Sequence, residues 1–380
     1  MYYFDNSATT KPTTEILDIY QKVSLNYFGN PSSAHKLGEE AKALMTSARR
    51  QIATILGFES NEIYFASSGT EVNNWVMQPI LKAIKQIHPN RNKVLISSIE
   101  HPATMKQIPL LESLGYQVEL IKVDANGQID LAHFETLLDN EVLLVSVMGV
   151  NNEVGAIQPV KEIATLLQKF PQVIWHMDGV QTITSQIELL REPRIDMITL
   201  SSHKFHSVRG VGILAQRQRV PNMPLLHGGG QETGRRSSTE NLAGIVATSR
   251  ALRKMNEIQV DTKERLADYR SRIIETLKNL DWQVFAETTS SEHIVCAALA
   301  PVPGEVLLHA LEAHDIFVST TSACASRSHQ EHATLKAMEI PDEISKSAIR
   351  LSMAHSTTVE DVDYLLKTLE QVTEQFKNYA

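Results

Sequence analysis

An acid, a lysine and a turn rich in serine and glycine follow apolar segments at three points of this 380-residue sequence. Asp178 ends the apolar run 173–177, Lys204 ends the run 197–203, and the turn 67–70 follows a third, shorter run. If these runs are neighbouring strands, their ends meet at one edge of a sheet, where ligands of open α/β folds bind. The three features would then face a common pocket.

These features match what pyridoxal phosphate needs from a protein. The cofactor uses an acid beside its protonated pyridine nitrogen and a lysine that bonds to its aldehyde. Its phosphate suits the N–H groups of a turn that opens a helix. Each feature alone is weak, because a Ser/Gly turn is often a simple helix cap and a lysine is usually a solvated surface residue. Their combination at one sheet edge indicates the cofactor.

The two cysteines stand in contrasting surroundings. Cys324 lies in the small, polar stretch 319–328, which predicts an exposed loop, whereas Cys296 lies in the apolar stretch 294–299, which predicts a buried strand. An unhindered thiol on a loop can react with a bound substrate and carry a product away. We interpret Cys324 as the reactive cysteine and Cys296 as a core residue.

Several histidines raise the possibility of a metal site, namely His203, His206, His329 and His332. No cysteine or acid joins them at a spacing typical of zinc sites. We expect no metal and interpret these histidines as solvated or in contact with a cofactor.

The elements that must position these residues alternate along the first two-thirds of the chain. Short apolar runs are separated by helix-period segments and lie at 63–65, 94–96, 118–123, 142–148, 173–177, 197–200 and 211–214. This alternation predicts a mostly parallel sheet covered by helices. The clearest helix is predicted to start near Ser33 and end at Gly57, with one apolar stripe formed by Leu37, Ala41, Leu44, Ala48, Ile52 and Ile55.

The pattern changes after about residue 250. A long amphipathic segment is followed by strand candidates at 282–285, 293–299, 316–319 and 349–353, which predicts a second, α+β domain. The last helix is predicted to begin at Thr357, with Glu360 three residues later as its capping-box partner.

Composition restricts the class of protein. The net charge is −8 with mixed signs, which argues against a nucleic-acid-binding surface as the main device. The N-terminus lacks the basic and apolar regions of a signal peptide, and no apolar run is long enough to span a membrane. Two cysteines are too few for a disulfide framework. We expect a cytoplasmic protein with a small-molecule substrate, no direct nucleic-acid contact and no membrane contact.

The ordered motifs of the chain resemble those of cysteine desulfurases in the class V aminotransferase group. The resemblance extends from Phe4 to Arg350 and is carried by the segments 4–10, 28–33, 67–74, 100–103, 150–155, 178–181, 201–204, 228–241 and 322–324. It implies an α/β protein of the fold-type I class of pyridoxal-phosphate-dependent transferases. A large domain, 15–255, would hold a mostly parallel seven-stranded sheet, and a smaller α+β domain would combine 1–14 with 256–380.

The resemblance also implies roles for individual residues. Lys204 would hold pyridoxal phosphate, Asp178 would pair with the ring nitrogen, and His101 would stack on the ring and assist catalysis. Arg350 would bind the substrate carboxylate through its planar guanidinium, with Asn30 nearby. The remaining implied cofactor contacts are Asn152 and Gln181 at the phenolic oxygen, Gly69, Thr70, Ser201 and His203 at the phosphate, and Thr239 from the other subunit of a homodimer.

The implied reaction removes sulfur from L-cysteine. Lys204 would act as the base, and the Cys324 thiolate would take the sulfur as a persulfide, leaving L-alanine. The sulfur would pass to an acceptor protein, either an iron–sulfur scaffold or a tRNA-thiolating enzyme. Departures from the family pattern affect local loop geometry and lie at Ser207-Val208, Ser238, Thr320-Thr321 and Met353-Ala354.

Three alternatives stay open on sequence grounds. A selenocysteine lyase or cysteine sulfinate lyase would share nearly every cofactor residue and differ mainly around Cys324. An aminotransferase would yield a keto acid instead of alanine. A catalytically weak scaffold that binds sulfur-acceptor proteins is disfavoured because Lys204, Asp178, His101, Arg350 and Cys324 are all present.

Overall fold

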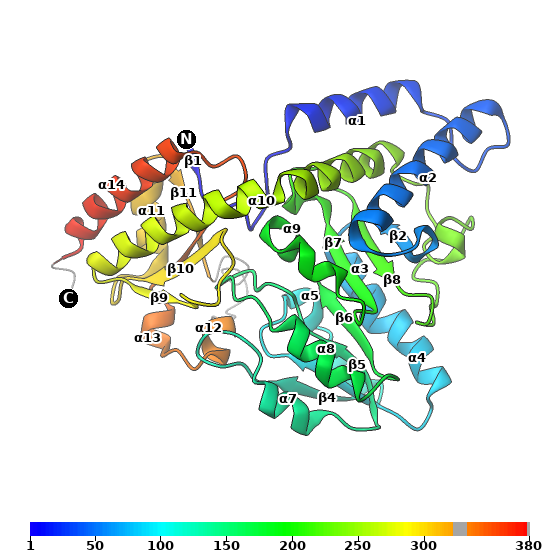
Figure 1. Cartoon of the computed structure of the whole chain (residues 1–380), viewed down its shortest axis with the longest axis horizontal. Helices are drawn as coiled ribbons and strands as arrows, with labels where there is room; N and C mark the ends of the chain where they lie inside the picture. The colour runs from blue at the N-terminus through cyan, green and yellow to red at the C-terminus, as the bar shows by residue number, and fades with distance from the viewer. Residues whose placement is uncertain (322–332, 378–380) are drawn as a thin grey trace.

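The computed structural model describes residues 1–321 and 333–377, which form three sheets and their covering helices (Figure 1). Cys324, the predicted reactive cysteine, lies outside the described residues. Within these ranges, no helix combines the length and apolar character needed to cross a membrane. The same ranges contain no group of three or more His, Cys, Asp or Glu residues placed to hold a metal ion.

The largest sheet has seven strands, and every apolar run predicted as a strand contributes one. Strands β3 to β7 are parallel, whereas β8 runs against both of its neighbours. The spatial order is β2 (Ile63–Ala66), β8 (Gly212–Gln216), β7 (Met197–Ser201), β6 (Ile174–Asp178), β5 (Val142–Ser146), β3 (Lys93–Ser97) and β4 (Gln117–Ile121). The prediction of a mostly parallel sheet is confirmed.

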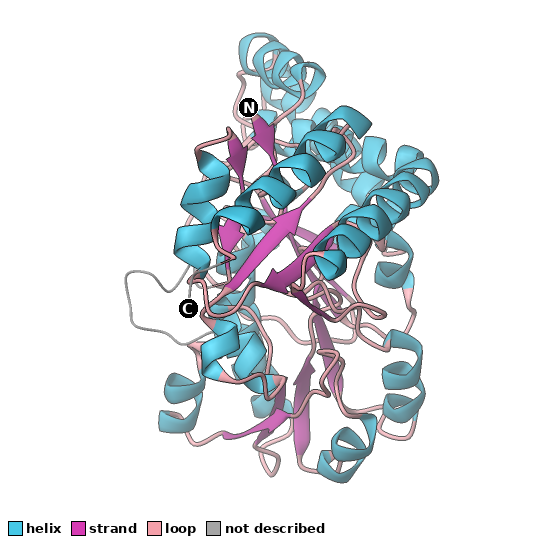
Figure 2. Ribbon diagram, turned by 90° about the vertical axis from the view of Figure 1, so that its left-hand side faces the viewer, coloured by secondary structure: helices cyan, strands magenta, loops and turns pink. Residues whose placement is uncertain are grey.

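Helices cover both faces of this sheet because its strands are apolar on both sides (Figure 2). Alternate residues of a strand point to opposite faces, so Val145 belongs to one core and Leu144 to the other. The first face is covered by α2 (Lys36–Leu56), α7 (Leu131–Leu137), α8 (Val160–Gln168) and the first half of α10 (Leu242–Asn279). The second is covered by α3 (Gly69–Trp75), α4 (Leu81–Ile87) and α6 (Ile108–Ser113).

Other helices complete this part of the chain. Helix α1 (Thr14–Asn26) packs on α10. A short π-helical segment, Val76–Ile80, joins α3 to α4 and contains a proline. Two one-turn helices follow strands near the candidate site, α5 (Pro102–Met105) and α9 (Thr182–Ser185).

Helix ends differ from the predictions by a few residues. Helix α2 begins at Lys36, because the His35 side chain caps it, and it ends before Gly57, whose φ of 74° suits a residue without Cβ. Leu37 is 42% exposed and does not belong to the buried stripe. The last helix, α14 (Val359–Gln375), has its capping box between Thr358 and Asp361, one residue later than predicted.

The C-terminal part is built on a four-stranded antiparallel sheet in the order β12 (Ser319–Thr320), β13 (Ala348–Ser352), β10 (Ile294–Ala298) and β9 (Gln283–Phe285). Strand β1 (Tyr2–Tyr3) pairs in parallel with β11 (Ile316–Phe317), so the N-terminus lies here. The helices of this part are α11 (Gly304–Glu312), α12 (Ala333–Ala337), α13 (Asp342–Ser345), α14 and the second half of α10.

Helix α10 runs diagonally across the molecule and connects two hydrophobic cores (Figure 1). Its first half buries Leu252 and Met255 in the core of the large sheet, and its second half buries Leu266 and Ile273 in the C-terminal core. We therefore propose, as the sequence suggested, that 15–255 form one domain and that 1–14 and 256–380 form the other.

Candidate active site

One pocket, with about 1140 Å³ of empty space, lies where the carboxyl ends of the large sheet face the C-terminal sheet. It collects most of the predicted site residues, namely Gly69, Thr70, His101, Asn152, Asp178, Gln181, Ser201, His203, Lys204 and Arg350. Asn30 is exposed and lies outside the lining of this pocket, where its side chain accepts from the N–H of Ser32 at 2.9 Å.

The sheet topology explains this convergence. Asp178 is the last residue of β6, and Lys204 lies in a single turn, Ser202–Lys204, directly after the neighbouring strand β7. Gly69 opens α3 after β2, and Ser68 caps that helix by accepting from the N–H of Glu71 at 3.2 Å. Strand ends therefore deliver the acid, the lysine and the helix N-terminus to one place.

Asp178 is buried and held by two hydrogen bonds. Its Oδ2 accepts from Asn73 Nδ2 at 2.8 Å, and its Oδ1 accepts from the N–H of Val180 at 3.0 Å. Both bonds orient the side chain towards the pocket. An oriented anion in this position can hold a positively charged ring nitrogen.

A buried polar chain lies beneath Asp178. His176 Nδ1 bonds to Ser146 Oγ and its Nε2 bonds to Thr199 Oγ1, both at 2.9 Å. Burial lowers the pKa of His176 to about 4, so the ring is neutral at physiological pH. The chain links β5, β6 and β7 and fixes their register directly below the acid.

Lys204 is oriented by the N-terminal segment. Its Nζ donates to the carbonyl oxygens of Ser7 at 2.5 Å and Ala8 at 3.0 Å, and Gln181 Nε2 also donates to the Ser7 carbonyl at 2.9 Å. Ser7 and Ala8 line the pocket, although the sequence analysis assigned them no role. His203 Nδ1 bonds to Thr9 Oγ1 at 3.1 Å.

His101 caps the short helix α5 with its ring. The Nδ1 atom accepts from the N–H of Ala103 at 3.1 Å, which assigns the hydrogen of the neutral ring to Nε2. Burial lowers the pKa of His101, with the charge of Asp178 opposing this effect. His101 therefore offers the site a hydrogen-bond donor through Nε2.

Arg350 lies on β13 and forms the wall of the pocket opposite Lys204 and Asp178. Its Nη1 donates to the carbonyl oxygen of Asn152 at 2.8 Å, and its Nη2 donates to Asp5 Oδ1 at 2.7 Å. Its Nε is buried and has no partner among the described residues. A carboxylate is the natural ligand for such a guanidinium.

Two acids near the pocket were missed by the sequence analysis, Glu100, which is buried, and Glu153, which is half-buried. Glu100 directly precedes His101, and burial raises the pKa of its carboxyl to about 8. Glu153 lines the pocket, and burial raises the pKa of its carboxyl to about 7. Both lie in motif segments that the sequence analysis singled out, but their burial depends on residues distant in the chain.

The donor set fits pyridoxal phosphate. A Cβ added to Gly69 would stand 3.3 Å from the side chains of both Ser201 and Val180, so glycine keeps the helix opening clear. The N–H groups of the first turn of α3 and the hydroxyls of Thr70 and Ser201 can bind a phosphate there. Asp178 suits the ring nitrogen and Lys204 the aldehyde.

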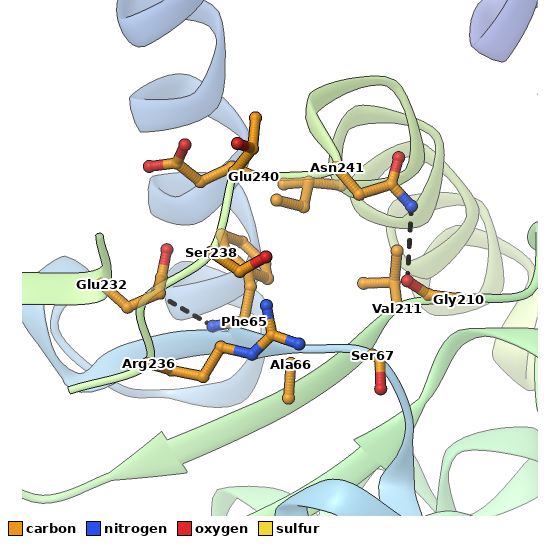
Figure 3. A pocket seen from close by; sticks show the side chains of 12 residues that line it. Phe65, Ala66, Ser67, Gly210, Val211, Glu232, Arg236, Ser238, Glu240 and Asn241 are labelled. Carbon is orange, nitrogen blue, oxygen red and sulfur yellow. Dashed lines mark hydrogen bonds between the residues drawn. The ribbon is translucent and has the colours of Figure 1, made fainter. Parts of the chain in front are cut away.

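Thr239 lies in a different hollow of about 600 Å³, lined by the end of β2, Gly210-Val211 and the segment 232–241. Figure 3 shows Glu232, Arg236 and Ser238 on this segment. The N–H of Phe65 donates to Glu232 Oε2 at 2.9 Å, and Arg49 pairs with the same acid. Arg236 Nε donates to Glu71 Oε1 at 2.7 Å, which ties the segment to the first turn of α3.

Of the two cysteines, the structure describes Cys296. Cys296 is fully buried on β10, and burial raises the pKa of its thiol, so it is an unreactive core residue as predicted. Cys324 lies outside the described residues.

Comparisons with known proteins extend over nearly the whole chain. The Aminotransferase class-V family model matches residues 2–365. The "NifS/IcsS protein homolog" of Lactobacillus delbrueckii subsp. bulgaricus is 40% identical and covers 99% of this chain and 98% of its own length. The "Cysteine desulfurase IscS" of Methanosarcina thermophila is 35% identical and covers 100% and 93% respectively. The solved structure of a "NIFS-LIKE PROTEIN" is 34% identical and has a TM-score of 0.90. The match covers 98% of this chain and 98% of that chain.

Proposed function

Because this chain belongs to the class-V aminotransferase family, we infer that it is a cysteine desulfurase that depends on pyridoxal phosphate. The observation that carries the inference is one pocket that joins a lysine, a buried aspartate and a helix N-terminus on one wall to an arginine on the other. L-Cysteine is the substrate, and sulfur-acceptor proteins are the partners.

Each wall of the pocket has a separate task in this proposal. When bound, pyridoxal phosphate supplies an electron-withdrawing ring that stabilises negative charge on the substrate carbon beside the amino group. Asp178 would keep the ring nitrogen protonated, and Gln181 and Asn152 would form hydrogen bonds with the phenolic oxygen. Arg350 holds the substrate carboxylate, which presents the Cα hydrogen of cysteine to the opposite wall.

Lys204 and His101 handle protons. Lys204 Nζ is held at the pocket by the Ser7 and Ala8 carbonyls, and as a neutral amine it would take the Cα proton of the substrate. His101 carries its hydrogen on Nε2 and is neutral. It can therefore donate a hydrogen bond to a sulfur atom that gains negative charge.

Cys324 is the proposed sulfur acceptor. Its thiolate attacks the substrate sulfur, the new S–S bond forms as the C–S bond breaks, and the electron pair of the C–S bond passes to the substrate carbon. Protonation of that carbon and return of a proton to Cα give L-alanine, and the enzyme keeps a persulfide. The persulfide sulfur then passes to an iron–sulfur scaffold or a tRNA-thiolating enzyme in the cytoplasm.

We also propose a homodimer. Thr239 does not line the pocket that holds Lys204 in its own chain, whereas its segment is anchored next to the first turn of α3. A second subunit that presents Thr239 to the phosphate would explain why this hydroxyl lies away from its own pocket. Asn30 is proposed to join the substrate site under the same arrangement, because it too lies outside its own pocket.

The products of L-cysteine turnover test the function. The purified protein with pyridoxal phosphate and a thiol reductant should release alanine and sulfide in equal amounts, and Lys204→Ala should release neither. An aminotransferase would instead form a keto acid and leave the sulfur on it. Keto acid without sulfide from the wild-type protein would therefore refute the proposal.

A further inference from the structure

Asp5 contacts Arg350, the residue proposed to bind the substrate carboxylate. Its Oδ1 accepts from Arg350 Nη2 at 2.7 Å and from Ser319 Oγ at 2.8 Å. Arg350 and Ser319 line the pocket, whereas Asp5 does not. Asp5 therefore acts on a ligand only through the arginine.

The backbone holds Asp5 in this place. It forms a parallel bridge with Ser352, two residues beyond Arg350 on β13. On its two sides, Phe4 N–H donates to the Phe317 carbonyl at 2.8 Å and Asn6 N–H donates to the Ser352 carbonyl at 3.3 Å. The carboxylate is therefore fixed in position, although it comes from the opposite end of the chain.

The guanidinium of Arg350 already forms two hydrogen bonds within the protein before a ligand binds. Asp5 occupies Nη2 and the carbonyl of Asn152 occupies Nη1, so both groups set its direction. Glu153 also lies close enough to affect Arg350 electrostatically, but burial raises its pKa to about 7, which leaves it partly neutral at physiological pH. Among the described residues, Asp5 is thus the acid that forms an ion pair with Arg350.

We propose that Asp5 is a positioning residue that aims Arg350 and limits its affinity for the substrate and product carboxylate. A bound carboxylate places a second anion on a cation that is already paired, so each anion weakens the hold on the other. Weaker binding of the carboxylate favours the release of alanine, which carries the same carboxylate group as cysteine. This inference rests on the proposed role of Arg350 as the carboxylate site.

Neutral replacements of Asp5 separate this role from simple support of the fold. Asp5→Asn keeps an oxygen that can accept from Arg350 and Ser319 but removes the charge. Partial exposure of Asp5 screens the repulsion, so we expect roughly a tenfold gain in carboxylate affinity. Asp5→Ser is a second neutral variant, and Asp5→Glu keeps the charge.

The probe is propionate, which has a carboxylate but no amino group to react with the cofactor. Its dissociation constant is measured by calorimetry on the cofactor-loaded enzyme, with the KM and kcat for L-cysteine and the melting temperature measured alongside. Asp5→Asn and Asp5→Ser should bind propionate more tightly and show a lower KM, while Asp5→Glu should stay near the wild type. Asp139→Asn is the control, because Asp139 also pairs with a buried cation, Lys93, away from the pocket.

The variant Arg350→Ala distinguishes failure of the proposed role of Arg350 from failure of the inference about Asp5. If this variant binds propionate as well as the wild type, Arg350 is not the carboxylate site and that part of the proposed function fails. If Arg350→Ala loses binding but both neutral Asp5 variants bind no more tightly than the wild type, only the inference about Asp5 is overturned.

Discussion

The carboxyl of Glu100 should stay protonated at neutral pH, and replacing it by glutamine should remove one titrating proton from the enzyme. Its Oε1 accepts from Ser97 Oγ at 2.7 Å and from the N–H of Met148 at 2.6 Å. Its Oε2 is buried with no partner among the described residues. Burial is the main cause that raises its pKa from an ordinary 4.5 to about 8, and the nearby charge of Asp178 adds to it.

The magnitude follows from that difference. At about 1.4 kcal/mol per pKa unit, ionising Glu100 costs about 5 kcal/mol more in the folded protein than in the unfolded chain. Because the folded-state pKa is the higher one, the folded protein keeps a proton that the unfolded chain releases between pH 4.5 and about 8. The free energy of unfolding should fall as pH rises through this window, and Glu100→Gln should lack that part of the fall.

Infrared difference spectroscopy of the cofactor-loaded enzyme measures the proton directly. The wild type should show a protonated-carboxyl band at about pH 6 that disappears with a midpoint near 8, and Glu100→Gln should lack this band. Glu153→Gln is the matched control, because it should remove a different band with a midpoint near 7. If the wild type and Glu100→Gln do not differ in the protonated-carboxyl band at about pH 6, Glu100 is ionised and the reasoning from burial is wrong.

Three further predictions concern the proposed chemistry. Asp178→Ala should still bind pyridoxal phosphate but lose at least a hundredfold in turnover, measured as alanine formation, because the ring nitrogen loses its anion; an unchanged rate would remove Asp178 from the mechanism. A mixed dimer of Lys204→Ala and Thr239→Ala chains should keep one intact site, measured as about half the activity per dimer; two equally damaged sites would place both lesions within single chains. Cys324→Ser should keep the cofactor but lose the persulfide, detected by mass spectrometry after labelled cysteine, whereas a label on Cys296 would contradict the assignment.

The sequence was sufficient to locate the strands of the large sheet, with ends that differ from the observed ones by up to two residues. Apolar runs that are short and separated by helix-period segments predict parallel strands, and all seven runs form strands of one sheet. Parallel topology then brings the ends of β6 and β7 together, so Asp178 and Lys204 were expected to share a pocket and do. Some helix ends were also displaced: the last helix was predicted to begin at Thr357, whereas Thr358 is its cap and accepts from the N–H of Asp361.

The electrostatic setting of the site could not be predicted in the same way. Glu100 and Glu153 look like ordinary acids in the sequence, and their raised pKa values come from burial by segments far apart in the chain. The role of Asp5 depends on a contact with Arg350 across 345 positions. A pattern of apolar residues reports which face of an element is buried, but not which distant side chain meets it.

The N-terminal segment connects both walls of the pocket, and this is where the missed contacts gather. Asp5 pairs with Arg350 on the C-terminal sheet, whereas the carbonyls of Ser7 and Ala8 accept from Lys204 beside the large sheet. A span of four residues thus contacts both the proposed carboxylate site and the proposed base. The separation of these two groups is therefore set by a short piece of backbone, which explains how a pocket between two sheets with separate cores can hold a small amino acid in one orientation.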